Sequence, residues 1–414
     1  MQVKQFKRWI SVSLVLWVGL SGTASAIPAE QPHFKDVSGH WAENTITRLV
    51  DDGILDGFPD GTFRPDESVT ADQFIKMLLT SYSQQYPNGE RKWTNEFVQS
   101  LSALNQSILS QDYRTFNFKP NPNGYWAKPF IDIASDLQFI SKSQFPDFKA
   151  KLKREQVAEI IYYTAKETEY LEDEEYSRKA ASGIGDLQSA NPREQKFIAE
   201  AFTKGIMEGY PNGYFGVGRD VTRAESLAIL DRIVHKEKRI QTSGSGQPAL
   251  EKIVPTRDGG YKKIIFPDTK MLLAYDVLQD AAKRRGTNYD LEETTLRLYK
   301  DAEAKSQDLS KASADSHGEE AALWLEPQYR TYGVTVKAQE GMLARNQEAV
   351  KTFTNYLFAY DAMAFDELFM KVYNEVTLGR PVEDTTVQVG GYSVEIHVEN
   401  DLQTIVFSIL EKKV

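Results

Sequence analysis

The sequence has 414 residues, with 49 Lys and Arg against 59 Asp and Glu and a formal net charge of -10. So acidic a chain lacks the concentrated basic face that a nucleic-acid partner requires, and we predict no nucleic-acid binding. It contains no cysteine, so disulfides cannot stabilise an exported form. Stability must come from burial of apolar side chains, for which the length allows two or three domains.

The first 26 residues have the features of a secretory signal peptide. Basic residues precede an apolar run over 9–20, and Ala24-Ser25-Ala26 is a small-x-small cleavage site. The run is shorter than the about 20 residues that a membrane-spanning helix needs. We therefore predict export, with no transmembrane segment after cleavage of the leader.

One pair of motifs occurs twice at the same spacing. Residues 54–63 read ILDGFPDGTF and are followed by VTADQ at 69–73, and residues 206–215 read IMEGYPNGYF and are followed by VTRAE at 221–225. Pro followed by Asp or Asn and Gly is typical of tight turns. The Thr of each second motif can cap a helix together with the Gln or Glu three residues later. Each copy is predicted to be a helix-loop-helix unit.

A third, divergent copy lies between these two. Trp126-Ala127 matches the helix start at Trp41-Ala42, and Leu152–Gln156 stands in the capping-box register. Its loop is shorter and lacks the glycines, so we expect a different turn. Residues 81–125 separate the first and second copies and carry apolar residues at helical spacing, which predicts an added helix.

These motifs resemble the S-layer homology family. The match rests on Phe34-Lys-Asp-Val37, Trp41-Ala42, GFPDGTFRP at 57–65 and Thr222-Arg-Ala-Glu225, and it extends over about residues 34–235. The resemblance implies a mainly α module in which three helix-loop-helix repeats form a pseudo-trimer. It also implies binding of a secondary cell wall polymer, often one carrying pyruvate ketals on N-acetylmannosamine, in grooves between repeats.

The resemblance further implies the residues that contact the polymer. They are Asp36, Trp41, Trp126, Arg154, Asp186 and Arg223. A cation at a helix N-terminus is mildly unfavourable, and a guanidinium fork suits a carboxylate, so the two arginines point to a ligand. For the two tryptophans, core packing is an equal alternative. Because the first repeat has Ala71 at the arginine position, the second has Lys153 for Thr and the third lacks the Trp, we expect one or two competent grooves at most.

The remainder of the chain is predicted to form an α+β domain with an antiparallel meander. Asp268 is expected to cap a helix, with further helices over about 291–305 and 339–373. Two-residue turns at Gly390-Gly391 and Asn400-Asp401 would place apolar side chains of three strands on one face, with Ile396 opposite Ile405. The charged run over 166–179 is expected to be a solvated connection without a functional role.

These predictions divide the chain into seven segments: 1–26, signal peptide; 27–80, repeat 1; 81–125, helical insertion; 126–179, repeat 2; 180–236, repeat 3; 237–250, linker; 251–414, α+β domain of unknown function.

No motif for catalysis, a metal or a cofactor emerges. An EF-hand-like spacing from Asp56 to Glu67 fails because Phe58 and, in the third copy, Arg219 replace oxygen ligands. We predict an exported protein of a Gram-positive-type bacterium, held noncovalently on the cell wall polymer by its repeats and displaying its C-terminal domain. Two alternatives stay open: a wall-tethered extracellular enzyme, or a structural or assembly protein whose repeats do not bind.

Overall fold

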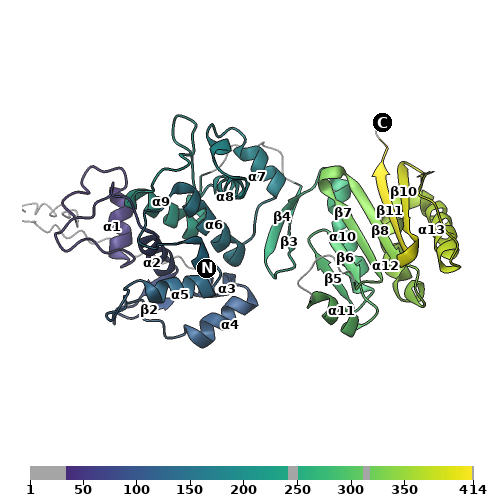
Figure 1. Cartoon of the computed structure of the whole chain (residues 1–414), viewed down its shortest axis with the longest axis horizontal. Coiled ribbons are helices and arrows are strands. Elements are labelled where there is room, and N and C mark those ends of the chain that lie inside the picture. The colour runs from purple at the N-terminus through teal and green to yellow at the C-terminus, as the bar shows by residue number, and fades with distance from the viewer. Residues whose placement is uncertain (1–33, 241–249, 311–317, 413–414) are drawn as a thin grey trace, which may run out of the picture.

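The computed structural model describes residues 34–240, 250–310 and 318–412. The predicted signal peptide and most of the predicted linker lie outside the described residues. Figure 1 shows a helical N-terminal part, in purple to teal, beside a C-terminal part built on a sheet, in green to yellow, with a small hairpin between them. The helical and sheet-rich halves predicted from the sequence are confirmed.

The N-terminal part contains three helix pairs, α1/α2, α5/α6 and α8/α9, and an insertion after the first pair. Its elements are α1 (Glu43–Asp51), α2 (Ala71–Ser81), β1 (Ser83–Gln85), β2 (Arg91–Trp93), α3 (Asn95–Ser100), α4 (Ala103–Asp112), α5 (Lys128–Asp136), α6 (Arg154–Thr168), α7 (Glu174–Ala181), α8 (Pro192–Thr203) and α9 (Arg223–Val234). The insertion, expected to add a helix, forms α3, α4 and the short hairpin β1–β2.

A closed ring of backbone hydrogen bonds joins the three helix pairs. Val69 donates its N–H to the carbonyl of Val221 (2.9 Å), Val221 donates to Leu152 (2.9 Å), and Leu152 donates back to Val69 (3.0 Å). These residues directly precede the N-caps of α2, α9 and α6, and their side chains are almost fully buried. Each repeat therefore satisfies the backbone of another in a dry environment, where an unpaired group is costly.

A carboxylate at the start of the first and third repeats holds the loop of the same repeat. Asp36 accepts hydrogen bonds from the N–H groups of Phe63 (2.8 Å) and Arg64 (2.7 Å). Asp186 accepts from Phe215 (2.6 Å), and from Gly216 and Val217 (2.8 Å each). Burial acts to raise the pKa of both carboxyls, but these N–H groups stabilise the anions and hold each pKa below its ordinary value.

The C-terminal part is a seven-stranded antiparallel sheet with a separate two-stranded hairpin. The hairpin is β3 (Glu251–Pro255) and β4 (Tyr261–Ile265), and the sheet has the order β5-β6-β7-β8-β11-β10-β9. The sheet strands are β5 (Tyr289–Glu292), β6 (Thr295–Leu298), β7 (Ala321–Glu326), β8 (Thr331–Lys337), β9 (Thr385–Val389), β10 (Tyr392–Glu399) and β11 (Thr404–Glu411).

One face of this sheet is apolar and is covered by helices. The helices of this part are α10 (Thr269–Lys283), α11 (Ala302–Leu309), α12 (Met342–Phe358) and α13 (Ala362–Thr377). α10, α12 and α13 contribute to the core, and Phe365 and Phe369 of α13 contact Phe407 of the sheet. As predicted, Asp268 caps α10 by accepting from Met271 N–H at 2.9 Å.

One predicted helix was wrong, and another is divided into two. Residues 291–305 contain the end of β5, all of β6 and only the start of α11. Tyr289 and Leu291 alternate with polar residues, as in a strand, and Glu293 adopts the positive φ of a turn. The helix expected over 339–373 is divided into α12 and α13, because Ala359 leaves helical geometry at φ 48° and ψ -108°.

The predicted meander is correct at one turn and shifted at the other. Val389 pairs with Tyr392 across Gly390-Gly391, as expected. Ile396 pairs with Phe407 and not with Ile405, because the second connection is longer and ends at Gln403 with φ 52°. The partner of Ile396 is thus shifted by two residues. Strand side chains alternate with a period of two, so this shift leaves each side chain on the face that was predicted. Strands β7 and β8 were not predicted.

We expect Asp186→Asn to weaken the loop of the third repeat. Asparagine offers one acceptor oxygen and turns an NH₂ donor toward backbone N–H groups, so unfolding in urea at pH 7 should require about 1 kcal/mol less. Because the folded-state pKa of Asp186 is lowered, its contribution is present above the ordinary value of 3.8 and is lost as the pH falls through the folded-state value. The stability difference should therefore shrink in acid.

Asp112→Asn is the matched control, since Asp112 is an exposed residue at the end of α4. An equal loss of stability in both variants, or a difference that does not change with pH, would contradict the assigned role of Asp186.

Candidate polymer-binding grooves

Two arginines insert from one repeat into the loop of another. Arg154, the first residue of α6, lies between the rings of Tyr210 (4.6 Å) and Phe215 (4.7 Å) and donates from Nη2 to the Glu208 carbonyl at 2.6 Å. Its Nη1 lies 3.6 Å from Glu225. The side chain thus joins the second repeat to the third and packs against the loop of the third repeat.

Arg223 makes the same arrangement between the third repeat and the first. Its guanidinium lies 5.0 Å from the ring centre of Phe58 and 4.5 Å from that of Phe63, and Nε donates to the Phe63 carbonyl at 3.0 Å. Both arginines are 5–6% exposed, so each guanidinium is largely enclosed by the loop against which it packs. Only an edge of each is available to a ligand.

The edge of Arg154 lines a groove of about 730 Å³, called here the large groove. It is bounded by Trp41 and Asp66 of the first repeat, Arg154 of the second, and Tyr210, Glu225 and Arg232 of the third. Trp41 is 65% exposed, so its ring is not core packing. A second cation, Arg232, lines the same groove, and its Nη2 donates to the Glu208 carboxylate at 3.1 Å.

The edge of Arg223 lines a much smaller hollow of about 150 Å³, called here the small groove. Its walls include Asp56 and Lys76 of the first repeat and Trp126 of the second. Trp126 is partly buried and packs against the core of the module. Small-molecule sites usually occupy about 300–1,000 Å³, so the large groove has the size of a ligand site and the small groove does not.

The first repeat has no arginine at the position of Arg154 and Arg223. Where Arg154 and Arg223 stand, the first repeat has Ala71, whose N–H donates to the Ala150 carbonyl at 3.2 Å. Arg193, near the start of α8, pairs with Glu159 at 2.9 Å and donates to the Tyr163 hydroxyl at 3.1 Å. This guanidinium crosses from the third repeat to the second and is bound to protein groups.

The remaining departure from the motif also has a physical explanation. Lys153, which replaces a capping Thr, forms an ion pair with Asp220 of the third repeat at 2.5 Å. The predicted capping box at Thr222 is present, with Thr222 and Glu225 each accepting from the other's backbone N–H. The structure thus brings Trp41 and Arg154 together at one groove and Trp126 and Arg223 at another.

Asp36 and Asp186 face their own loops and not the grooves. Polymer contact by the six predicted residues stays a prediction. Sequence reasoning missed Tyr210, Glu225 and Arg232 as groove residues. Glu225 and Arg232 are seven positions apart on α9, which places both on one side of the helix, and this spacing was the available signal.

Within 34–240, 250–310 and 318–412, every helix is too short or too polar to span a bilayer. In the same ranges, His, Cys, Asp and Glu side chains nowhere gather in threes that would hold a metal ion.

Comparison with known proteins supports the motif assignment. The family model described as S-layer homology domain matches residues 33–75 and 185–225. The chain is 26% identical over 249 residues to an endoglucanase of Bacillus sp. (strain KSM-635), covering 57% of this chain and 23% of that protein. It is 32% identical over 141 residues to S-layer protein EA1 of Bacillus anthracis, covering 28% and 16%.

A third relative is outer membrane protein SlpA of Deinococcus radiodurans, with 40% identity over 106 residues, 25% of this chain and 9% of that protein. The chain thus spans less than a quarter of the length of each of these three relatives. The matched segments carry the first and third repeats, including Trp41 and Arg223. The chain is thus identified as a secreted cell-surface protein that carries S-layer homology domains at residues 33–75 and 185–225.

Proposed function

We propose that the three repeats, arranged around a pseudo-threefold axis, hold the protein noncovalently on a secondary cell wall polymer that carries pyruvate ketals. The observation that supports this most is the large groove, where the exposed side chain of Trp41 and the edge of Arg154 line one space of ligand size. The C-terminal domain is then displayed at the cell surface.

The groove offers the chemistry that an acidic sugar needs. The guanidinium of Arg154 would bind the ketal carboxylate through charge-assisted hydrogen bonds, and Arg232 would add a second cation. The ring of Trp41 offers a flat apolar surface for the C–H face of a sugar. Because Arg154 is already fixed between two aromatic rings, binding costs little side-chain entropy.

Long-range electrostatics oppose this association. The chain has a formal net charge of -10, and the polymer is also acidic. Affinity must therefore come from contacts inside the groove, and steering of the polymer by the protein's overall field is not expected. Moderate salt should weaken the local ion pairs and the long-range repulsion together, so we expect a shallow dependence of binding on ionic strength.

We expect Trp41→Ala to lower the affinity for purified pyruvylated polymer about tenfold, the loss typical of one aromatic contact. Trp41 is 65% exposed, so the variant should keep its thermal stability. Binding is measured by calorimetry on the full chain. Tyr329→Ala is the matched control, because Tyr329 is equally exposed but lies in the C-terminal domain, and it should bind as the wild type does.

Arg154→Gln should cost more, about a hundredfold, because a charge-assisted hydrogen bond to the carboxylate is lost. Removal of the ketals from the polymer should lower wild-type affinity by a similar factor and leave Arg154→Gln almost unchanged. Arg114→Gln, at an exposed site in the insertion, is the control. Equal sensitivity of wild type and Arg154→Gln to ketal removal would show that this arginine does not recognise the carboxylate.

Catalysis by the C-terminal domain is a second candidate, favoured by the name of the endoglucanase relative. Incubation of the full chain with soluble glucans, followed by measurement of new reducing ends, tests it. Release of reducing ends would support a wall-tethered enzyme, and a flat time course with each glucan would exclude this reaction.

A further inference from the structure

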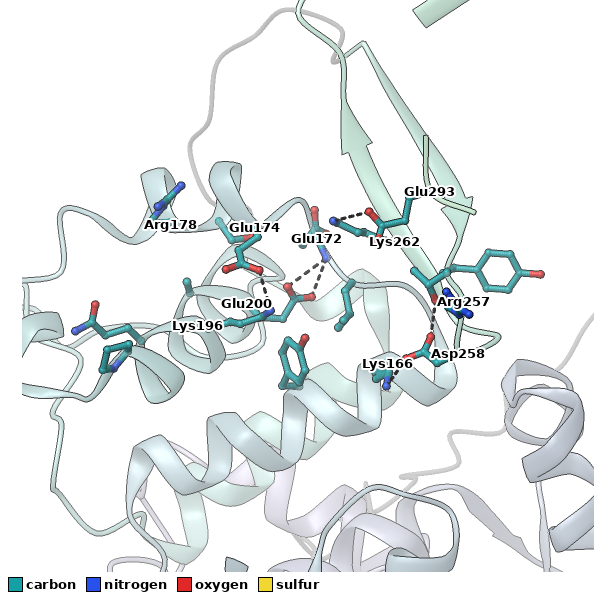
Figure 2. Close-up of a pocket in the computed structure, with 18 of the residues that line it drawn as sticks. Lys166, Glu172, Glu174, Arg178, Lys196, Glu200, Arg257, Asp258, Lys262 and Glu293 are labelled. Carbon is teal, nitrogen blue, oxygen red and sulfur yellow. Dashed lines mark hydrogen bonds and ion pairs between the residues drawn. The ribbon is translucent and has the colours of Figure 1, made fainter. Parts of the chain in front are cut away.

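The charged run over 166–179, expected to be a solvated connection, is partly buried and lies at the junction between the two parts of the chain. Leu171 donates its N–H to the Tyr261 carbonyl (2.9 Å) and accepts from the Lys263 N–H (2.6 Å), so the run covers the outer edge of β4. Figure 2 shows it beside the hairpin, with an ion pair across the contact. The free edge of the hairpin is thus occupied by another segment of the chain.

The sheet edge formed by β5, on the side of the hairpin, is protected as well. It carries Asp290 and Glu292, and charges on an edge strand discourage pairing with another chain. All four residues of β5 are partly buried. Directly after the strand, Glu293 donates its N–H to the carbonyl of Pro255 in β3 (2.7 Å). The opposite edge of the sheet has none of this protection.

That opposite edge is β9, the last strand of the sheet. On its outer side, β9 has no backbone hydrogen-bond partner among residues 34–240, 250–310 and 318–412. Val389 pairs with Tyr392 across a two-residue turn, so Val389 and every second residue before it bond to β10. The exposed residues Thr386 and Gln388 therefore direct their N–H and C=O groups away from the sheet.

The sequence of β9 does nothing to block this edge. It reads Thr-Thr-Val-Gln-Val, without charge or proline, and its register with β10 is unbroken, so it contains no bulge. Exposed apolar side chains lie near its end. The Asp361 carboxylate occupies the space that a Cβ on Gly390 would take, which places the start of α13 beside the turn after β9. Tyr360 and Met363, on either side of Asp361, are 103% and 78% exposed.

We propose that β9 pairs antiparallel with β9 of a second copy of this chain, around a two-fold axis at Val387. In this register Thr386 faces Gln388 of the second copy, and Gln388 faces Thr386 of the second copy. These are the residues whose backbone groups point outward, so the two pairs exchange four hydrogen bonds. Val387, which is partly buried at the helix-covered face, meets its own counterpart there. The same surface of each copy thus supplies both halves of the contact.

The charges at the two ends of the edge favour the antiparallel arrangement. Residues 383–384 are both acidic and exposed, and His397, 2.7 Å from the second of them, offsets their charge in part. The turn end carries Lys412, whose Nζ donates to the Gly390 carbonyl (3.3 Å), together with Asp361. A two-fold axis brings the acidic end of one copy to the mixed end of the other. Parallel pairing would instead place two acidic ends side by side.

The position of β9 in the molecule suits contact between copies. Figure 1 shows β10 and α13 at the end opposite to the helical module, and β9 is the neighbour of β10. A copy held by its module therefore presents this edge away from its own anchor. Copies held on one wall reach a high local concentration, which favours a weak pairing. That last step rests on the proposed function, whereas the pairing itself forms in solution.

Sedimentation velocity of the full chain over a range of concentrations tests the pairing. The contact is small, so we expect a weak monomer–dimer equilibrium in the micromolar range. Gln388→Pro removes an outward N–H without removing a bond to β10, and it should weaken dimerisation at least about tenfold. Gln388→Ala keeps this N–H and is the matched control, which should dimerise as the wild type does. Both variants should bind the wall polymer normally, so failure of the pairing and failure of anchoring are distinguishable.

Single cysteines test the register, because the chain has none of its own. Under mild oxidation, Val387→Cys should give a disulfide-linked dimer, since the two-fold axis places each cysteine opposite its counterpart. Thr385→Cys would face residue 389 of the second copy and should crosslink at least about tenfold more slowly. The proposal is overturned if the wild type stays monomeric up to millimolar concentration, if Gln388→Pro associates as strongly as Gln388→Ala, or if both cysteines crosslink at one rate.

Discussion

The anchoring module depends on the closed ring of hydrogen bonds among Val69, Leu152 and Val221. A backbone N–H in a dry core must find an acceptor, and each of these finds it in a different repeat. Separation of one repeat from the other two would therefore leave an unpaired backbone N–H in one of them and an unpaired carbonyl in the other. Because each donor sits just before a helix, the ring also fixes where three helix N-termini point and hence where the grooves form.

The two arginines have a structural role beside the recognition role that we propose for them. Arg154 and Arg223 each support a loop of another repeat between two aromatic rings, and each leaves an edge at a groove. This explains why a cation is kept at a helix N-terminus, where the dipole disfavours it. It also means that loss of either arginine disturbs a loop as well as a groove, so exposed Trp41 gives the cleaner test of binding.

The parts of the fold that depend on residues close together in the sequence could be predicted. The turns around Gly61 and Gly213, both with positive φ, the capping box at Thr222 and the pairing across Gly390-Gly391 all follow from nearby residues. The register of β10 and β11 was harder, because the length of a turn decides it. The burial of Glu169 and Glu172 could not be predicted from the sequence. It depends on ion pairs with Lys204, Arg239 and Lys263, which are distant in the chain.

The absence of cysteine from the chain permits a direct test of the ring. Ala42, Ala134 and Ala201 are almost fully buried, one in each repeat, and each can be replaced singly by cysteine. If the ring makes the repeats one cooperative unit, the three thiols will become reactive toward a labelling reagent with the same free energy of opening and the same dependence on urea. A thiol that reacts at lower urea, with a shallower slope than the other two, would show that its repeat opens alone and would contradict the account.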